Sequence, residues 1–184
     1  MKNNFFCNKP YINLYERASN NKKISSQILY GERFKVIKKV KNFLKIKTSY
    51  DNYYGYIKNN KFKNKFNPTH KVKTLKTRIY KSNNFLPFSS KIQILKKKKN
   101  QIMFEKNKWI KSKDLSIINK KEKNFNKILK YYLNCRYKWG GKTFNGIDCS
   151  ALIQICYKYN NQFFPRDTKD QVKIKKGFIK KKKI

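Results

Sequence analysis

Hydrophobic and polar residues alternate in two separate stretches of this chain, over residues 33–46 and again over residues 91–104. The stretches align at a constant offset of 58 residues, which pairs Phe34 with Ile92, Val36 with Ile94, Leu44 with Ile102, and Ile46 with Phe104. A period of two is typical of a strand with one buried face. The repeat predicts two small β-barrels, at about residues 10–66 and 71–118. The alternative is one larger mixed sheet.

The hydrophobic period changes after Lys120, which predicts a third, helical region over residues 122–184. A helical stripe is formed at i, i+3, i+4, i+7 and i+8 by Phe125, Ile128, Leu129, Tyr132 and Leu133. A turn-rich segment over residues 137–147 comes next. The second predicted helix covers residues 148–159, with a stripe of Leu152, Ile155, Cys156 and Tyr159. The predicted fold class is therefore α+β.

The strongly basic composition changes this picture little. The net charge is +39, but 43 of the 48 basic residues are Lys and only five are Arg. Lys, Asn and Ile, whose codons are rich in A and T, make up nearly half of the chain, which indicates mutational drift. Nucleic-acid readers favour the bidentate fork of Arg. We therefore expect no specific nucleic-acid partner, only salt-sensitive contact with polyanions.

Other classes are disfavoured by what the sequence lacks. No apolar run of about 18 residues is present to span a membrane. The start of the chain has no apolar core of a secretion signal, so a cytoplasmic location is predicted. The four Cys have no short paired spacing, which argues against a disulfide scaffold or a zinc site. We expect no metal, no cofactor and a monomer.

Residues that are rare in this chain concentrate between positions 140 and 170, including three of its six Gly and three of its nine acidic residues. Asp148 is a predicted N-cap, which places Cys149 in the first turn of the second helix. Free N–H groups and the helix dipole stabilise a thiolate there. Cys149 is thus a candidate nucleophile, and the alternative is an ordinary buried Cys. Cys135 and Cys156 read as core residues.

Three ordered motifs resemble the NlpC-type cysteine peptidases, a papain-like family that cuts peptidoglycan peptides. They are Tyr137-Lys-Trp-Gly-Gly, Gly146-Ile-Asp-Cys-Ser150 and Phe164-Pro-Arg-Asp-Thr168. The N-terminal half is similar to the subgroup with two bacterial SH3-like barrels, through Leu29-Tyr-Gly-Glu32 and Thr69-His-Lys-Val72. The resemblance covers about residues 11–178. It implies two SH3-like barrels followed by the N-terminal helical half of a papain-like domain.

The resemblance also implies roles for individual residues. Cys149 would attack the amide that follows D-γ-Glu, and the Tyr137 hydroxyl would help to polarise the carbonyl. The substrate cleft would be lined by Asp148, Ser150, Arg166, Asp167 and Thr168. Glu32 and Tyr53, from the first barrel, would hold the free amino group of an N-terminal L-Ala. The alternatives are that Glu32 is a turn residue and that Tyr53 is a surface aromatic.

The sequence departs from the family at the catalytic base. The family uses a His on a strand beyond the Cys, whereas the single His here is His70, in the linker between the barrels. The hypothesis is a chain truncated before its base, through a frameshift or stop near the lysine run at 180–183, with slippage restoring the enzyme as an alternative. We expect little hydrolysis, and an apolar stripe on the second helix left without a packing partner. The alternative function is a non-catalytic module that binds cell-wall peptides, or a degenerate pseudogene product.

Overall fold

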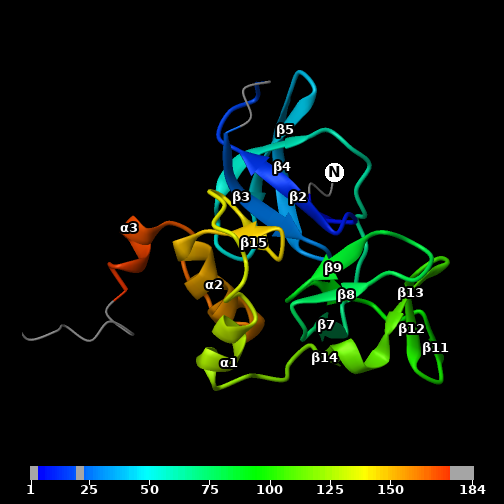
Figure 1. Ribbon diagram of the computed structural model, residues 1–184. Coiled ribbons are helices and arrows are strands. Elements are labelled where there is room, and N and C mark those ends of the chain that lie inside the picture. The colour runs from blue at the N-terminus through cyan, green and yellow to red at the C-terminus, as the bar shows by residue number, and fades with distance from the viewer. Residues whose placement is uncertain (1–3, 20–22, 175–184) are drawn as a thin grey trace, which may run out of the picture.

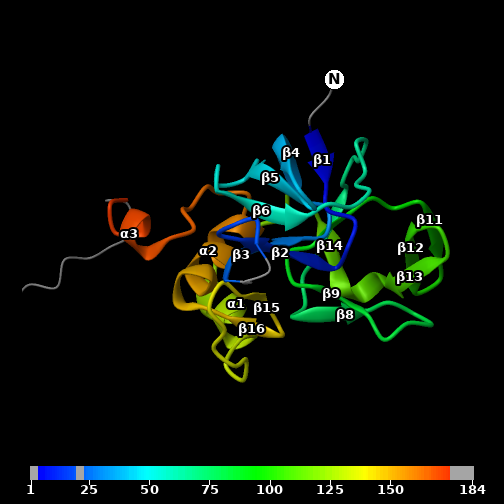
Figure 2. The same ribbon diagram turned by 90° about the horizontal axis from the view of Figure 1, so that it is seen from above.

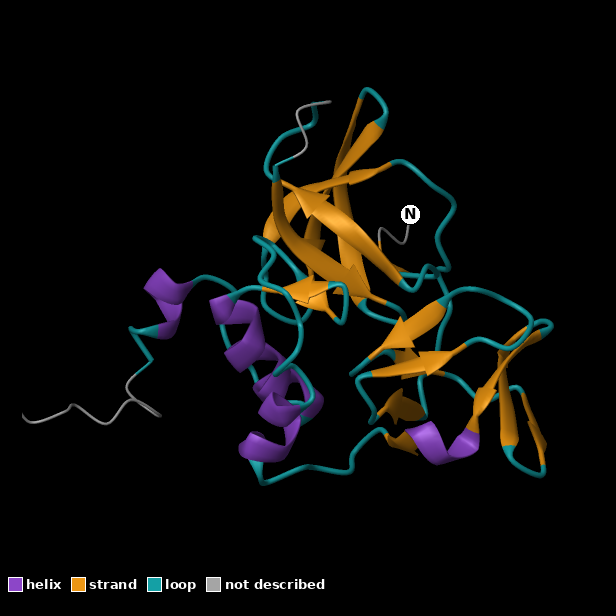
Figure 3. Cartoon of the chain, viewed as in Figure 1, coloured by secondary structure: helices purple, strands orange, loops and turns teal. Residues whose placement is uncertain are grey.

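A computed structural model describes residues 4–19 and 23–174 of the chain. Within these residues the protein is a mixed α/β structure, with many short strands and few helices (Figures 1 and 3). The lysine run at 180–183 and the last ten residues of the predicted 122–184 domain lie outside the described residues. None of the described helices is long and apolar enough to cross a membrane.

The first structural unit is a single antiparallel sheet with the strand order β1-β4-β5-β6-β2-β3. Its strands are β1 (Asn4–Phe6), β2 (Tyr11–Tyr15), β3 (Ile24–Leu29), β4 (Arg33–Val40), β5 (Phe43–Thr48) and β6 (Tyr54–Lys58). Strand β4 pairs with β5 through the central match of Val36 with Ile46. The core of this unit contains Leu14, Ile28, Phe34, Ile46 and Ile57, each at most 1% exposed.

The second unit consists of three smaller antiparallel sheets. One has the order β10-β7-β14, one has the order β11-β12-β13, and the third pairs β8 with β9. The strands are β7 (His70–Val72), β8 (Lys76–Arg78), β9 (Phe85–Pro87), β10 (Lys91–Ile92), β11 (Lys96–Lys98), β12 (Gln101–Glu105), β13 (Lys108–Lys111) and β14 (Leu115–Ile117). A 3-10 turn over Ser112–Asp114 leads into β14.

The sequence repeat marks equivalent core positions in the two units. Ile46 in the first core corresponds to Phe104 in the second, and both are buried. The two units form separate sheets, so the alternative of one larger sheet is not what the chain adopts. Closed barrels are not seen either, because the strand orders of the described residues form open sheets. Figure 2 shows the first unit and β11–β13 lying apart in space.

The helical region contains α1 (Phe125–Lys130), the hairpin of β15 (Lys142–Thr143) and β16 (Gly146–Ile147), α2 (Cys149–Tyr159) and α3 (Thr168–Gln171). Helix α1 is shorter than its predicted stripe. Ile128 and Tyr132 are buried, but Leu133 is 76% exposed because the helix ends at Lys130 and the chain turns away. The predicted stripe therefore runs past the end of the helix, and its last member, Leu133, does not pack in the core.

The apolar stripe of α2 is covered by both β-units, which corrects the expectation that it lacks a packing partner. Ile155 and Tyr159 share one core with Leu29 of the first unit and Phe88 of the second. The rings of Phe88 and Tyr159 stack with centroids 4.7 Å apart. Burial of each such side chain contributes about 1.5–3 kcal/mol. The two β-units therefore supply the surface on which α2 is fixed.

Candidate active site

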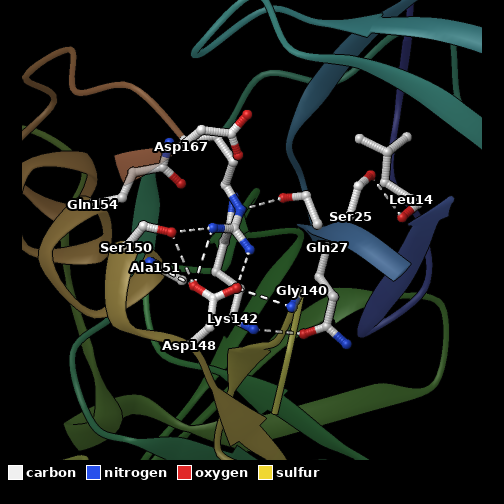
Figure 4. Close-up of polar contacts among 12 residues, drawn as sticks. Leu14, Ser25, Gln27, Gly140, Lys142, Asp148, Ser150, Ala151, Gln154 and Asp167 are labelled. Atoms are coloured by element: carbon white, nitrogen blue, oxygen red, sulfur yellow. Dashed lines mark hydrogen bonds and ion pairs between the residues drawn. The ribbon is translucent and has the colours of Figure 1, made fainter. Parts of the chain in front are cut away.

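Cys149 begins helix α2, and Asp148 is the N-cap of that helix. The Asp148 carboxylate accepts a hydrogen bond from the Ala151 N–H at 2.8 Å, as an N-cap side chain does. Its second oxygen accepts from the Gly140 N–H at 2.9 Å. Figure 4 shows Asp148 between these two donors, with Ser150 beside it. The N-cap predicted from the sequence is confirmed, and Cys149 is exposed at the first turn.

Arg166 holds Asp148 from the other side. Its Nη1 donates to Asp148 Oδ1 at 3.0 Å, and its Nη2 lies 2.5 Å from Asp148 Oδ2. Nη1 also donates to Ser150 Oγ at 2.6 Å, and Nε donates to Ser26 Oγ on β3 at 3.0 Å. Burial opposes ionisation of Asp148, but the hydrogen bonds and charge of Arg166 outweigh it and lower the pKa of Asp148. Arg166 thus ties the nucleophile helix to the first sheet.

The loop before α2 docks on the first sheet through backbone contacts. The Lys142 N–H donates to Gln27 Oε1 at 2.8 Å. Gly140 has a φ of +71°, and a Cβ at this position would lie 2.5 Å from the carbonyl oxygen of Ile24. Only glycine fits such a close approach in the left-handed region. Gly140 of the Tyr137 motif therefore lets the loop lie against β3.

A cavity of about 300 Å³ opens beside Cys149. Its lining includes eight of the nine predicted site residues, namely Tyr53, Tyr137, Asp148, Cys149, Ser150, Arg166, Asp167 and Thr168. Tyr137 is 63% exposed at the rim. The Tyr53 hydroxyl donates to Asp167 Oδ1 at 3.3 Å, so the first sheet and the segment beyond α2 meet in this cavity. Burial raises the pKa of Tyr53 to about 12, which keeps it a hydrogen-bond donor.

Glu32 is the predicted site residue that does not line this cavity. It lies in the turn after β3, is 7% exposed and forms an ion pair with Lys158 of α2 at 2.5 Å. Glu32 lines a different cavity. Arg166 does line the Cys149 cavity, but its guanidinium is 3% exposed and bound to protein groups.

Four residues that line the cavity were missed as site residues: Glu16, Ser25, Trp139 and Lys169. Trp139 belongs to the Tyr137 motif, so the motif itself contained the signal. Glu16 follows β2 and is the acidic residue of the first unit that lines the cavity. The chain has only nine acidic residues, and this scarcity was the one sequence signal that could have pointed to Glu16. Among the described residues no three His, Cys, Asp or Glu gather as a metal site.

Iodoacetamide is expected to alkylate Cys149 much faster than the three other Cys near neutral pH. Cys149 is exposed, whereas burial raises the pKa of the other three thiols, those of Cys7 and Cys156 to about 12. The thiolate is the reactive form, so these three thiols should stay protonated. Peptide mass spectrometry after timed quenching measures the four rates. Equal rates in the folded protein would contradict the placement of Cys149.

Comparison with known proteins supports this arrangement. Residues 14–62 match the family model described as "Bacterial dipeptidyl-peptidase Sh3 domain", and residues 134–184 match the NlpC/P60 family. A γ-D-glutamyl-L-lysine dipeptidyl-peptidase of Bacillus subtilis (strain 168) is 40% identical over 47 residues. That stretch is 26% of this chain and 16% of the relative, so the chain matches only a small part of that protein.

Two solved structures share the fold. An NlpC/P60 family protein from Bacillus cereus ATCC 10987 has a TM-score of 0.77 at 15% identity, over 92% of this chain and 76% of that one. An NlpC/P60 endopeptidase from Photobacterium damselae subsp. piscicida has a TM-score of 0.67 at 14% identity, over 92% of this chain and 45% of that one. The two structures show that the fold is shared. By its family matches, residues 134–184 are similar to the NlpC/P60 family, and residues 14–62, ahead of that segment, are similar to a bacterial SH3 domain.

Proposed function

We propose that this chain recognises peptidoglycan-derived peptides that begin with a free L-Ala followed by D-γ-Glu, and that Cys149 is the nucleophile aimed at the amide after D-γ-Glu. The observation that carries the proposal is the cavity shared by Cys149 and the first sheet. The same cavity offers the sulfur of Cys149 and the hydrogen-bonded pair of Tyr53 with Asp167. A peptide bound in it would contact both.

The acidic side of the cavity supplies the recognition of an amino terminus. Asp167 and Glu16 both line the cavity, and each offers carboxylate oxygens that accept hydrogen bonds from an ammonium group. A longer peptide would place a neutral amide against these carboxylates and lose the charge-assisted hydrogen bonds that an ammonium group supplies. Glu16, rather than Glu32, is the acidic residue of the first unit in position for this role. Lys169, on the same cavity, is the group of the right charge for the free α-carboxylate of D-γ-Glu.

The chemistry that follows from this placement is acyl transfer to sulfur. The Cys149 thiolate would attack the carbonyl carbon and form an S–C bond. The C–N bond then breaks, which leaves a thioester on Cys149, and the amine departs after taking up a proton. Asp148 caps the Ala151 N–H, which leaves the N–H groups of Cys149 and Ser150 as the first-turn donors that would stabilise the developing oxyanion. The Tyr137 hydroxyl, at the rim of the cavity, would add a side-chain hydrogen bond to the same carbonyl oxygen. Water then hydrolyses the thioester, and both proton transfers need a general base.

Peptide binding tests the proposal separately from turnover. In a Cys149→Ala background, the tripeptide L-Ala-γ-D-Glu-L-Lys is expected to bind measurably by isothermal titration calorimetry. Its N-acetylated form is expected to bind at least about tenfold more weakly, because a charge-assisted hydrogen bond is worth about 1.5–3 kcal/mol. Asp167→Asn should produce a similar loss for the free peptide only.

Asp170→Asn is the matched control for that experiment. Asp170 lies three residues further on, on α3, and pairs with Lys173 at 3.4 Å on the surface. It does not line the cavity, so its removal should leave the affinity unchanged. Equal affinity for free and acetylated peptides would refute amino-terminus recognition at this site.

Binding without turnover is the second candidate function. It is favoured by the position of His70, the single His of the sequence, which lies on β7 and lines a cavity of the second unit. A chain that binds the peptide in the titration but does not consume it would act as a cell-wall-peptide binding module.

A further inference from the structure

A second polar cavity lies where the first sheet, the second unit and the end of α2 meet. Its volume is about 330 Å³, and its charged lining consists of Glu32, Arg33, Lys91 and Lys158. It shares no lining residue with the cavity beside Cys149. The structural units thus enclose a site that the proposed peptidase chemistry does not use.

The charges around this cavity do not balance. Lys158 and Glu32 form an ion pair at 2.5 Å, with side chains 2% and 7% exposed, and so cancel each other. Lys91 and Arg33 remain as two positive charges on the same cavity. Burial and the positive charge of Lys158 lower the pKa of Lys91, while Glu32 opposes this. The lining therefore has three cations against one carboxylate, an excess of two, with Arg33 on the exposed side.

Lys158 is also short of hydrogen-bond acceptors. Its ammonium has three N–H donors and lies 4.5 Å from the centre of the Tyr50 ring. Apart from the ion pair with Glu32, no described residue gives Lys158 Nζ a hydrogen-bond partner. A buried ammonium that has one acceptor for its three donors is costly, so further acceptors supplied by a ligand fit this position.

Chance accumulation of Lys does not account for the site. Drift toward Lys fills the surface with exposed cations, whereas Lys158 is at least nine-tenths buried. Arg33 is one of only five Arg in the chain. A guanidinium matches the geometry of phosphate oxygens through two parallel N–H donors.

We propose that this junction cavity binds a small doubly charged oxyanion of the phosphate type, held by Lys158, Lys91 and Arg33. Two negative charges would neutralise the two uncompensated cations, and the oxygens would accept the free donors of Lys158. The ligand would touch all three parts of the chain: the first sheet through Arg33, the second unit through Lys91, and α2 through Lys158. Occupancy would therefore stabilise their packing, since a ligand that binds only the folded state raises its stability.

Inorganic phosphate is the probe for this site. Thermal unfolding of the full chain is measured in phosphate and in sodium chloride at equal ionic strength and pH. Phosphate is expected to raise the melting temperature of the parent chain. Lys91→Gln and Arg33→Gln should each remove at least half of that rise, and titration calorimetry should show phosphate affinity reduced about tenfold. These positions are used because replacing Lys158 would leave Glu32 buried without a partner.

Lys96→Gln and Arg78→Gln are the matched controls, since each removes one equivalent charge from an exposed position on the second unit that does not line the cavity. Both should keep the full response to phosphate. An equal response in all five proteins would show general screening of a polycation by an adventitious ion only, and would overturn the proposal. Absence of any response in the parent chain would overturn it as well. Neither outcome bears on peptide binding beside Cys149.

Discussion

Replacing Arg166 with alanine is expected to lower the free energy of unfolding by about 3–5 kcal/mol, because it leaves the buried Asp148 carboxylate without its partner. Arg166 is 3% exposed, and its guanidinium contacts Asp148 through two nitrogens. It also donates to Ser26 on β3, so its loss removes one of the contacts that tie the start of α2 to the first sheet. Urea denaturation followed by circular dichroism measures the change.

Arg78→Ala is the control for this substitution, since Arg78 is exposed and a surface change of this kind falls within about 0.5 kcal/mol. The double variant Arg166→Ala, Asp148→Asn should recover part of the loss, because no unpaired charge is then buried. A loss below about 1 kcal/mol in Arg166→Ala would contradict the positioning role that the geometry gives to Arg166.

The pH dependence of stability gives a second readout of the same contact. The pKa of Asp148 is lowered in the folded state, so its stabilising contribution is complete above the pH at which the unfolded carboxyl titrates, near 3.8. The contribution is lost as the pH falls through the lower pKa of the folded state. The parent chain should therefore lose this part of its stability in acid, and Arg166→Ala should not. A purely steric role for Arg166 would leave the two acid profiles parallel.

The sequence repeat predicted which strand positions are buried, but it did not predict whether the sheets close into barrels. Phe34 and Ile92 are buried because alternation along a strand fixes which side chains share a face. Closure into a barrel depends on hydrogen bonds between strands distant in sequence, and alternation does not encode these. The end of α1 at Lys130 was missed for a related reason. A stripe shows which face is apolar but not where the chain turns away.

The candidate site was predictable where a motif is local, and less so where two units meet. Asp148 and Cys149 follow from helix-start chemistry, and Asp167 follows from a motif close to them in sequence. The sequence could not decide whether Glu16 or Glu32 belongs to the site beside Cys149, because this depends on which end of the first sheet docks on α2. The structure turns Glu32 toward Lys158 and leaves Glu16 on the Cys149 cavity. Arg166 was likewise predicted from its motif to contact the substrate. In the structure its guanidinium instead donates hydrogen bonds to Asp148 and Ser150.

Hydrolysis of L-Ala-γ-D-Glu-L-Lys by the 184-residue chain is expected to be slow, because no His lines the Cys149 cavity. A positioned general base typically contributes about 10²–10⁴-fold to the rate. His70 lies on β7 and lines a cavity of the second unit, so His70→Ala should leave the slow rate unchanged. Added imidazole should raise the rate in proportion to its concentration, because it can take the thiol proton from solution.

Cys149→Ala is the matched control for this rescue, and it should show no imidazole-dependent release of L-Lys from the same peptide. Chromatographic quantification of L-Lys over time measures both chains. The exposed position of Cys149 at the cavity gives imidazole access to the sulfur, whereas Cys156 is buried and should contribute nothing. Fast turnover without imidazole that disappears in His70→Ala would contradict this account, because it would require His70 to reach Cys149 from the second unit and serve as the base.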